Sequence, residues 1–268
     1  MPTRDEAWTH GTPCWADCQV DDTEKAREFY SALFGWTIDA VPGEAGGYLM
    51  AFKGGKAAAG IGPKPEGMQM PSAWTSYIAA TSADDVQAKI EKAGGQVFAP
   101  AFDVLDVGRM LIAGDTSGAA FGVWEAKAHI GAQVYNEDGA LCWNELHTKD
   151  YDGAKKFYAE VFDYQFTEMG DGTTFSYTTF ALPGGTDGVG GMYKDNDLPE
   201  GMPPYWLAWF QSDDVDATLA KATELGATKL MGPDDSPFGR MIVVQAPQGE
   251  VFGVIDPTTT SGEPPAGS

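Results

Sequence analysis

The stretch CWADCQVDDTEKAREFYSALFGW, from Cys14 to Trp36, decides the organisation of this chain because it occurs twice. It returns as CWNELHTKDYDGAKKFYAEVFDY from Cys142 to Tyr164, and 142 − 14 gives a shift of 128 residues without a gap. The identical pairs are Cys14/Cys142, Trp15/Trp143, Asp22/Asp150, Ala26/Ala154, Phe29/Phe157, Tyr30/Tyr158 and Phe34/Phe162. A long self-repeat defines the structural unit of a chain. The sequence therefore predicts one domain that is built twice.

Local patterns inside the repeat predict a strand followed by a helix. Residues 14–20 alternate as a β-strand does, so odd and even positions point to opposite faces. Asp22 is a suitable N-cap for a helix over residues 23–34. Strands are expected near 36–41, 48–52 and 57–61, which completes one β-α-β-β-β unit. Gly60-Ile61-Gly62 and the matching Gly188-Val189-Gly190 are interpreted as turns.

A second unit of the same kind follows in each half. In the first half it consists of a strand over 74–81, a helix opened by Asp84-Asp85-Val86, and strands near 96–98, 109–113 and 120–125. The chain thus divides into a first domain, 1–126, a polar linker, 127–140, a second domain, 141–257, and a Pro/Gly/Ser-rich tail, 258–268. A tail of this composition is expected to be disordered.

The composition excludes several classes of partner. With 17 Lys and Arg against 39 Asp and Glu, the 268-residue chain has a formal net charge of −22. Nucleic acids and anionic membranes both require a basic surface, so we expect neither as a partner. The three cysteines, the lack of a long apolar run and the polar first eleven residues predict a reduced, cytoplasmic protein.

The two halves also end alike, in DTSGAAFGVW and APQGEVFGVI. With the strand–helix repeat and the Asp-Asp-Val helix openings, these segments resemble the vicinal-oxygen-chelate superfamily, which includes glyoxalase I, bleomycin-resistance proteins and extradiol dioxygenases. The tandem layout is similar to that of the two-domain glyoxalase-like proteins of actinobacteria, including the mycobacterial secreted antigen often labelled "hydroxylase". The resemblance spans residues 8–257. It implies an α+β fold in which pairs of βαβββ modules form a curled mixed sheet around a cleft in each domain.

The resemblance also implies where a metal would bind, and this chain departs from that pattern. The ligand positions of the family's metalloenzymes are occupied by Trp15 and Trp143 on the first strands, by Gly122 and Gly253 on the last strands, and, near the fifth strands, by Trp74 and Trp206. Indole and glycine side chains do not coordinate a divalent ion, which needs several N, O or S ligands. We therefore expect neither a metal nor another cofactor.

The family geometry places the odd-numbered first-strand residues in the clefts. The expected ligand-binding residues there are Trp15, Asp17, Gln19, Trp143, Glu145 and His147. Large aromatic plates beside a few polar groups are typical of small-molecule pockets. The alternative is that the tryptophans plug the clefts as core residues.

Two further pairs leave alternatives open. Glu145 and His147 lie on the same strand face, about 6.6–6.8 Å apart along the strand. They could line the cleft, recognise a ligand, share an ion or act as a catalytic acid–base pair. Arg109 and Arg240 occupy matched positions and offer a rigid donor fork to ligand oxygens. Each could equally pair with acidic neighbours.

The leading hypothesis is a small-molecule-binding protein of the glyoxalase/bleomycin-resistance type that holds a planar aromatic metabolite or antibiotic-like compound in secondary metabolism. The rival is a glyoxalase-like lyase or oxygenase with a centre rebuilt around Glu145 and His147, in which Arg240 steadies an enolate. The third hypothesis is a role in protein interaction, in which the clefts are vestigial. Because a tandem chain can pair its modules internally, a monomer and a homodimer are both compatible with the sequence.

Overall fold

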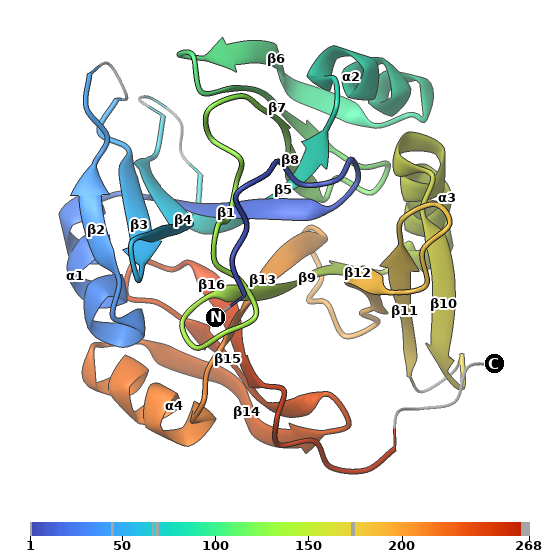
Figure 1. Cartoon of the computed structure of the whole chain (residues 1–268). Helices are drawn as coiled ribbons and strands as arrows, with labels where there is room; N and C mark the ends of the chain where they lie inside the picture. The colour runs from blue at the N-terminus through green and yellow to red at the C-terminus, as the bar shows by residue number, and fades with distance from the viewer. Residues whose placement is uncertain (1, 44–45, 66, 68–69, 173–174, 264–268) are drawn as a thin grey trace.

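The computed structural model describes residues 2–43, 46–65, 67, 70–172 and 175–263, which form two sheets of eight strands (Figure 1). The first half contains β1 (Pro13–Val20), α1 (Thr23–Phe34), β2 (Thr37–Ala40), β3 (Leu49–Lys53), β4 (Lys56–Pro63), β5 (Ala73–Ala80), α2 (Ala83–Lys92), β6 (Gln96–Val104), β7 (Gly108–Gly114) and β8 (Ala120–Ala126). The second half contains β9 (Leu141–Thr148), α3 (Tyr151–Phe162), β10 (Gln165–Gly170), β11 (Ser176–Ala181), β12 (Gly188–Lys194), β13 (Tyr205–Gln211), α4 (Val215–Glu224), β14 (Thr228–Ser236), β15 (Gly239–Gln245) and β16 (Val251–Asp256).

The strand order shows how each sheet is assembled. It is β2-β3-β4-β1-β5-β8-β7-β6 in the first sheet and β10-β11-β12-β9-β13-β16-β15-β14 in the second. The two βαβββ units of a sheet meet at an antiparallel pair, β1 with β5 or β9 with β13. Parallel pairs such as β1 with β4 and β5 with β8 make the sheets mixed. The expected α+β fold of paired βαβββ units is confirmed.

The repeat residues Asp22 and Asp150 start the first helix of each half. The Asp22 carboxylate accepts hydrogen bonds from the backbone N–H groups of Glu24 and Lys25, which have no partner inside the helix. The helix ends at Gly35, whose φ of 67° is a left-handed conformation that glycine adopts without strain. The observed bounds of α1 agree with the prediction from the sequence.

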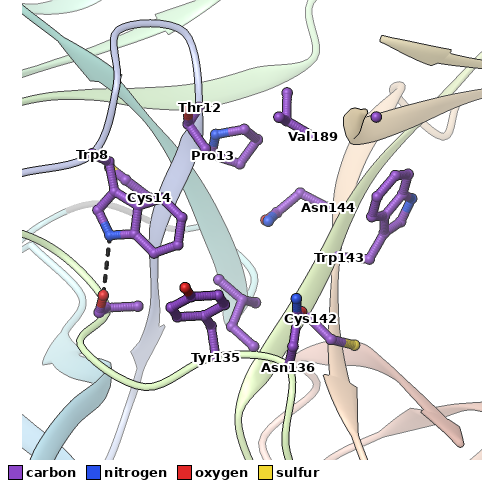
Figure 2. Close-up of a pocket in the computed structure, with 13 residues that line it drawn as sticks. Trp8, Thr12, Pro13, Cys14, Tyr135, Asn136, Cys142, Trp143, Asn144 and Val189 are labelled. Atoms are coloured by element: carbon purple, nitrogen blue, oxygen red, sulfur yellow. Dashed lines mark hydrogen bonds between the residues drawn. The ribbon is translucent and has the colours of Figure 1, made fainter. Parts of the chain in front are cut away.

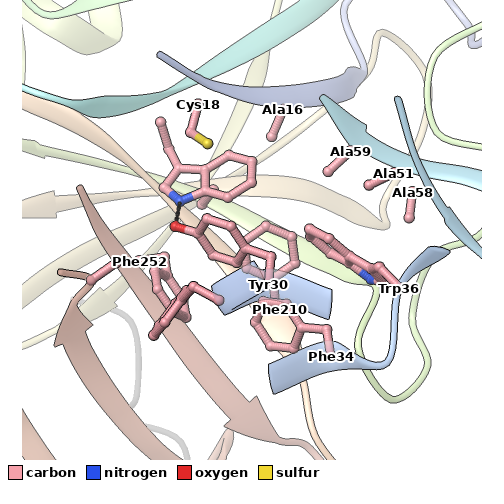
Figure 3. Close-up of a cluster of buried hydrophobic side chains, with 14 of the residues drawn as sticks. Ala16, Cys18, Tyr30, Phe34, Trp36, Ala51, Ala58, Ala59, Phe210 and Phe252 are labelled. Carbon is pink, nitrogen blue, oxygen red and sulfur yellow. Dashed lines mark hydrogen bonds between the residues drawn. The ribbon is translucent and has the colours of Figure 1, made fainter. Parts of the chain in front are cut away.

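The tyrosine of the Phe-Tyr pair in the repeat, Tyr30 or Tyr158, helps to join the two halves of the chain. The Tyr30 hydroxyl on α1 accepts a hydrogen bond from the Trp74 indole of its own sheet and donates one to Glu250 of the other half. Tyr30 and Phe34 pack against Phe210 and Phe252 of the second sheet (Figure 3). Tyr158 likewise accepts from Trp206. The sheets therefore share their cores through their helix-covered faces, and α1 lies beside α4 as α2 lies beside α3 (Figure 1).

Each sheet has a second face that its helices do not cover, which we call the helix-free face. On β1, Ala16, Cys18 and Val20 pack in the core under α1, so Trp15 and Asp17 point to the helix-free face. Strand pairing then sets Trp15 beside Tyr77 of β5, and Tyr77 beside Gly122 of β8. The predicted odd-numbered site residues therefore share one face in each half.

Three details differ from the sequence-based expectations. Gly60-Ile61-Gly62 is not a turn but lies within β4. Glycine is required at position 60 because a side chain there would collide with the Tyr48 hydroxyl. Gly190 lies within β12. β6 extends to Val104, with two register irregularities against β7.

The tail expected to be disordered is partly described by the structure. Residues 258–263 follow β16, and the backbone N–H of Ser261 donates to the Ser236 carbonyl at 2.8 Å. The Asp256 carboxylate accepts from the N–H and the hydroxyl of Thr258, which starts this ordered turn. Residues 264–268 lie outside the described part. Within the described part, no helix has both the length and the apolar character needed to cross a bilayer.

Candidate functional site

The helix-free face of the first sheet carries a closed group of side chains, which we call the first-sheet cluster: Trp15, Asp17, Tyr48, Tyr77, Trp124 and His129. The Trp15 indole donates to the Tyr48 hydroxyl, and Tyr48 and Tyr77 both donate to the Asp17 carboxylate, at 3.2 and 3.3 Å. Trp15 is only 3% exposed and Asp17 only 7%. The cluster is thus part of the core, in line with the plugging alternative for Trp15.

The connector between the sheets closes the first-sheet cluster. Its His129 ring lies edge-on to Trp15, with ring centroids 4.5 Å apart, and to Trp124. Burial lowers the pKa of His129 to about 4, and it raises the pKa of Asp17 to about 6 although both tyrosines stabilise the carboxylate. Near neutral pH the cluster therefore holds a neutral imidazole beside a carboxylate that burial disfavours.

The second sheet carries the matching second-sheet cluster: Trp143, Glu145, His147, Tyr177, Asp195 and Tyr205. The Trp143 indole donates to the Tyr177 hydroxyl at 2.9 Å, and that hydroxyl is hydrogen-bonded to Glu145. From there the chain continues, because His147 bridges Glu145 at 2.8 Å and Asp195 at 3.0 Å. The side chains of Glu145, His147 and Asp195 are 13–15% exposed.

The two carboxylates fix the charge of His147. An ionised carboxylate can accept hydrogen bonds but cannot donate them. An imidazole ring between two carboxylates therefore binds best when each of its nitrogens carries a proton. Burial opposes this charge, but the hydrogen bonds and charges of Glu145 and Asp195 outweigh it and raise the pKa of His147. The protonated form of His147 is therefore favoured, and both ring nitrogens are occupied by these hydrogen bonds.

Aromatic rings surround the hydrogen-bonded groups of the second-sheet cluster, and Tyr205, Phe175 and Phe238 among them are at least partly exposed. Tyr205 stacks on His147 with centroids 4.8 Å apart and an interplanar angle of 5°. Phe175 stacks on Tyr177, and Phe238, which is 37% exposed, lies beside Tyr177 as well. Flat, accessible π-faces next to a charged, hydrogen-bonding centre are suited to planar ligands.

The positions implied for metal ligands carry aromatic rings and glycines. Trp15 and Gly122 lie in register with Tyr77, and Trp143 and Gly253 lie in register with Trp209. Trp74 and Trp206, which were expected at the fifth-strand position, instead pack in the cores on the opposite faces. A Cβ atom at Gly122 or Gly253 would collide with the neighbouring Tyr77 or Trp209 ring, so no carboxylate is accommodated there. In the described ranges, no three His, Cys, Asp or Glu side chains are grouped so that they could hold an ion.

The remaining predicted residues lie apart from the two clusters. Gln19 is on the helix-free face of β1, next to Gly62 and Ala73, and is partly exposed. Arg109 shares a strand face with the core residue Leu111, so it lies on the helix-covered side, where it forms a two-pronged ion pair with Asp84. Arg240 pairs in the same way with Asp216 and also with Asp235. Both arginines thus take the acidic-neighbour alternative, on the face opposite to the tryptophans.

Sequence reasoning missed Asp195, Tyr177 and Tyr205. Asp195 directly follows β12, which runs parallel to β9, and its backbone N–H donates to the Thr148 carbonyl at the end of β9. Only the pairing of β12 with β9 brings it beside His147, and the sequence does not reveal that pairing. Tyr205 lies opposite His147 in the β9–β13 register. A polar residue just after a strand was the available signal for Asp195.

Comparison with proteins of known sequence identifies relatives over nearly the full length. "Putative glyoxylase CFP32" of Mycobacterium tuberculosis (strain CDC 1551 / Oshkosh) is 43% identical over 262 residues, covering 96% of this chain and 98% of the relative. "Anthracycline biosynthesis protein DauV" of Streptomyces sp. (strain C5) is 33% identical, with 92% and 93% covered.

Solved structures share the fold at low sequence identity. The Mn(II)-bound glyoxalase from Novosphingobium aromaticivorans has a TM-score of 0.61 at 15% identity, over 94% of this chain and 87% of that one. The 2,3-dioxygenase LapB from Pseudomonas sp. KL28 has a TM-score of 0.64 at 15% identity, over 97% and 96%. The family described as Glyoxalase/Bleomycin resistance protein/Dioxygenase superfamily matches residues 141–254. The chain belongs to this superfamily.

Proposed function

We propose that this protein binds a planar aromatic molecule on the helix-free face of its second sheet. One observation carries the proposal: Trp143, Tyr205 and the Glu145–His147–Asp195 group of the second-sheet cluster are partly exposed, whereas Trp15, Asp17, Tyr77 and Trp124 of the first-sheet cluster are buried. Rings such as Tyr205 and Phe238 would stack on the ligand, and the carboxylates would orient its hydroxyl groups.

The net charge of the chain and the name of one of its relatives limit the class of ligand that we propose. A chain with a net charge of −22 repels anions, so the ligand is neutral or cationic. The relative from Streptomyces is named for anthracycline biosynthesis, and anthracyclines are built on fused planar rings that bear hydroxyl and carbonyl oxygens. We infer a fused-ring hydroxyquinone or a compound of similar shape. The protein would sequester it or present it to another enzyme.

Tryptophan fluorescence provides the test, with 1,4-dihydroxyanthraquinone as a neutral, planar three-ring probe. The probe should quench the wild-type protein saturably, and His147→Ala should weaken its affinity about tenfold through lost stacking and hydrogen bonding. The matched control is Gln19→Ala, at the position equivalent to His147 on the first sheet, which should leave the affinity unchanged. Absence of saturable quenching, or equal effects of both variants, contradicts the proposal.

The Asp195–His147–Glu145 group favours a second candidate, a lyase- or oxygenase-type enzyme. The His147 ring, hydrogen-bonded to Asp195, holds the Glu145 carboxylate in position, as required of a group that removes a proton next to a carbonyl. Arg240 cannot steady the resulting enolate as expected from the sequence, because it lies on the helix-covered face with Asp216 and Asp235.

Glu145→Gln separates the two candidates. If Glu145 is a general base for a bound ketone, the variant retains affinity for 1,4-dihydroxyanthraquinone within about threefold. It loses the protein-catalysed exchange of the C10 methylene hydrogens of anthrone, a neutral three-ring ketone, with deuterated solvent, a rate effect of about 10²–10⁴. Unchanged exchange in Glu145→Gln excludes this reaction and leaves binding as the function.

A further inference from the structure

A pocket lies in the seam between the two sheets and adjoins the second-sheet cluster only at Trp143 (Figure 2). It has a volume of about 180 Å³ and is bounded by the start of β1, the start of β9, the start of β12 and the connector. Trp8 and Tyr135 cover it, and the Trp8 indole is held in place by a hydrogen bond to the Ala132 carbonyl at 3.0 Å. The pocket is therefore built by both halves of the chain together.

Its polar groups are few and neutral. Asn144 is 97% buried, since only 3% of it is exposed, and its Oδ1 accepts a hydrogen bond from Ser76 Oγ at 2.6 Å. Its side-chain amide nitrogen donates to no other group in the described part of the chain, and the side chain points into the pocket (Figure 2). The described residues that line the pocket include none with a charge. The equivalent of Asn144 in the first half is Ala16, so this amide exists only once.

We propose that the seam pocket binds a small uncharged aromatic molecule that carries a carbonyl group. The amide N–H of Asn144 faces the pocket rather than a protein acceptor. A carbonyl oxygen of a ligand can therefore accept its hydrogen bond. The lining provides no opposite charge for an ion, so the ligand is neutral. An apolar cavity of about 150 Å³ holds benzene, so about 180 Å³ accommodates one substituted ring.

This pocket is distinct from the proposed fused-ring site, although Trp143 borders both. Trp143 lies against Gly188 at the start of β12, donates its N–H to Tyr177 and presents another edge to the seam. A ligand in the seam would therefore contact the residue that begins the second-sheet hydrogen-bond chain. The proposal for the seam pocket does not depend on the proposed function, because Glu145, His147 and Asp195 do not line this pocket.

Fluorine NMR with three probes tests the proposal: 4-fluorobenzamide, 4-fluorotoluene, which lacks the carbonyl, and the anion 4-fluorobenzoate. The wild-type protein should bind the amide about fivefold more tightly than the toluene, as one buried hydrogen bond provides, and should not bind the benzoate. Val189→Phe, which adds a ring at the pocket wall, should abolish binding of both neutral probes.

A paired substitution isolates the amide without leaving Ser76 unsatisfied. Ser76→Ala combined with Asn144→Leu removes both hydrogen-bond partners together and should reduce the fivefold preference to about one. His147→Ala is the control and should leave the affinities for the two neutral probes unchanged, which separates this result from that of the fused-ring site. No binding of either neutral probe at millimolar concentration, binding that survives Val189→Phe, or a preference that survives the paired substitution would overturn the proposal.

Discussion

The helix-free faces of the two sheets begin with the same chain of side chains and end differently. On both sheets a tryptophan donates to a tyrosine, which is bonded to a carboxylate: Trp15, Tyr48 and Asp17 on the first, and Trp143, Tyr177 and Glu145 on the second. On the first sheet the hydrogen-bond series ends at Asp17, because Tyr77 donates to the carboxylate oxygen that Tyr48 leaves free. On the second it continues through His147 to Asp195.

Two substitutions account for the difference. Trp209 occupies the position equivalent to Tyr77 of the first sheet. An indole has no hydroxyl group, so Trp209 cannot donate a hydrogen bond to Glu145 as Tyr77 does to Asp17. His147 stands where the first sheet has Gln19 and provides a nitrogen for Asp195. The connector adds His129 as a plug on the first side only. Duplication has thus left one face that serves packing and one that retains accessible polar and aromatic groups.

The largest expected effect concerns the two tryptophans. Trp15→Ala should cost about 3–5 kcal/mol of the free energy of unfolding, because the side chain is 3% exposed and its removal leaves a cavity. Trp143→Ala should cost clearly less, since that side chain is partly exposed. Urea denaturation of both variants measures the difference. Equal losses would break the distinction between a sealed and an accessible face.

The next effect concerns the pH dependence caused by Asp17. Its pKa is about 6 in the folded chain against 3.8 ordinarily, so the folded state keeps a proton that the unfolded state releases. Stability is then lost as pH rises from about 4 to 6, by up to about 3 kcal/mol, and the full penalty remains above pH 6. Asp17→Asn should remove this dependence and stabilise the protein at pH 7, as unfolding at pH 4, 5 and 7 would show. A variant that keeps the wild-type profile argues against a strained carboxylate.

The opposite sign is expected on the second sheet. The pKa of His147 is raised, so its ion pairs stabilise the fold below about pH 6.5 and are lost as pH rises through the folded-state pKa. Asp195→Asn should cost about 1.5–3 kcal/mol at pH 6 and lower the pKa of His147. In a proton NMR titration His147 should titrate above its ordinary value and His129 near 4. Two histidines that titrate together would remove the electrostatic contrast.

The smallest effect is expected at the arginines. Arg240→Lys should change stability by less than about 1 kcal/mol, because its ion pairs are at the surface, and should not change the affinity for 1,4-dihydroxyanthraquinone. Arg109→Lys is the matched variant of the first sheet. A large loss of affinity in Arg240→Lys alone would restore that residue to the ligand site.

The repeat and its local signals were sufficient to predict the helices, the strands and the repeated βαβββ units, because strand alternation, helix caps and turn glycines are local. The pairing of these units into curled sheets was implied by the resemblance to the superfamily. The helix at 23–34 and the order of the strands follow from such signals. The state of the site residues did not follow, because Trp15 and Trp143 are identical in type and in sequence context. Their different burial is set by His129 and by Tyr77 against Trp209, which approach through tertiary structure. The partner of His147 depends on parallel pairing of β12 with β9, which no local pattern encodes.

The most direct test of the central claim is to map a planar ligand on the protein by backbone amide chemical-shift changes upon addition of 1,4-dihydroxyanthraquinone. The account predicts changes that concentrate on β9, β11, β12 and β13 around Glu145 and His147, and none on β1, β3 and β4. Changes centred on the first sheet, or equal changes on both, would contradict it.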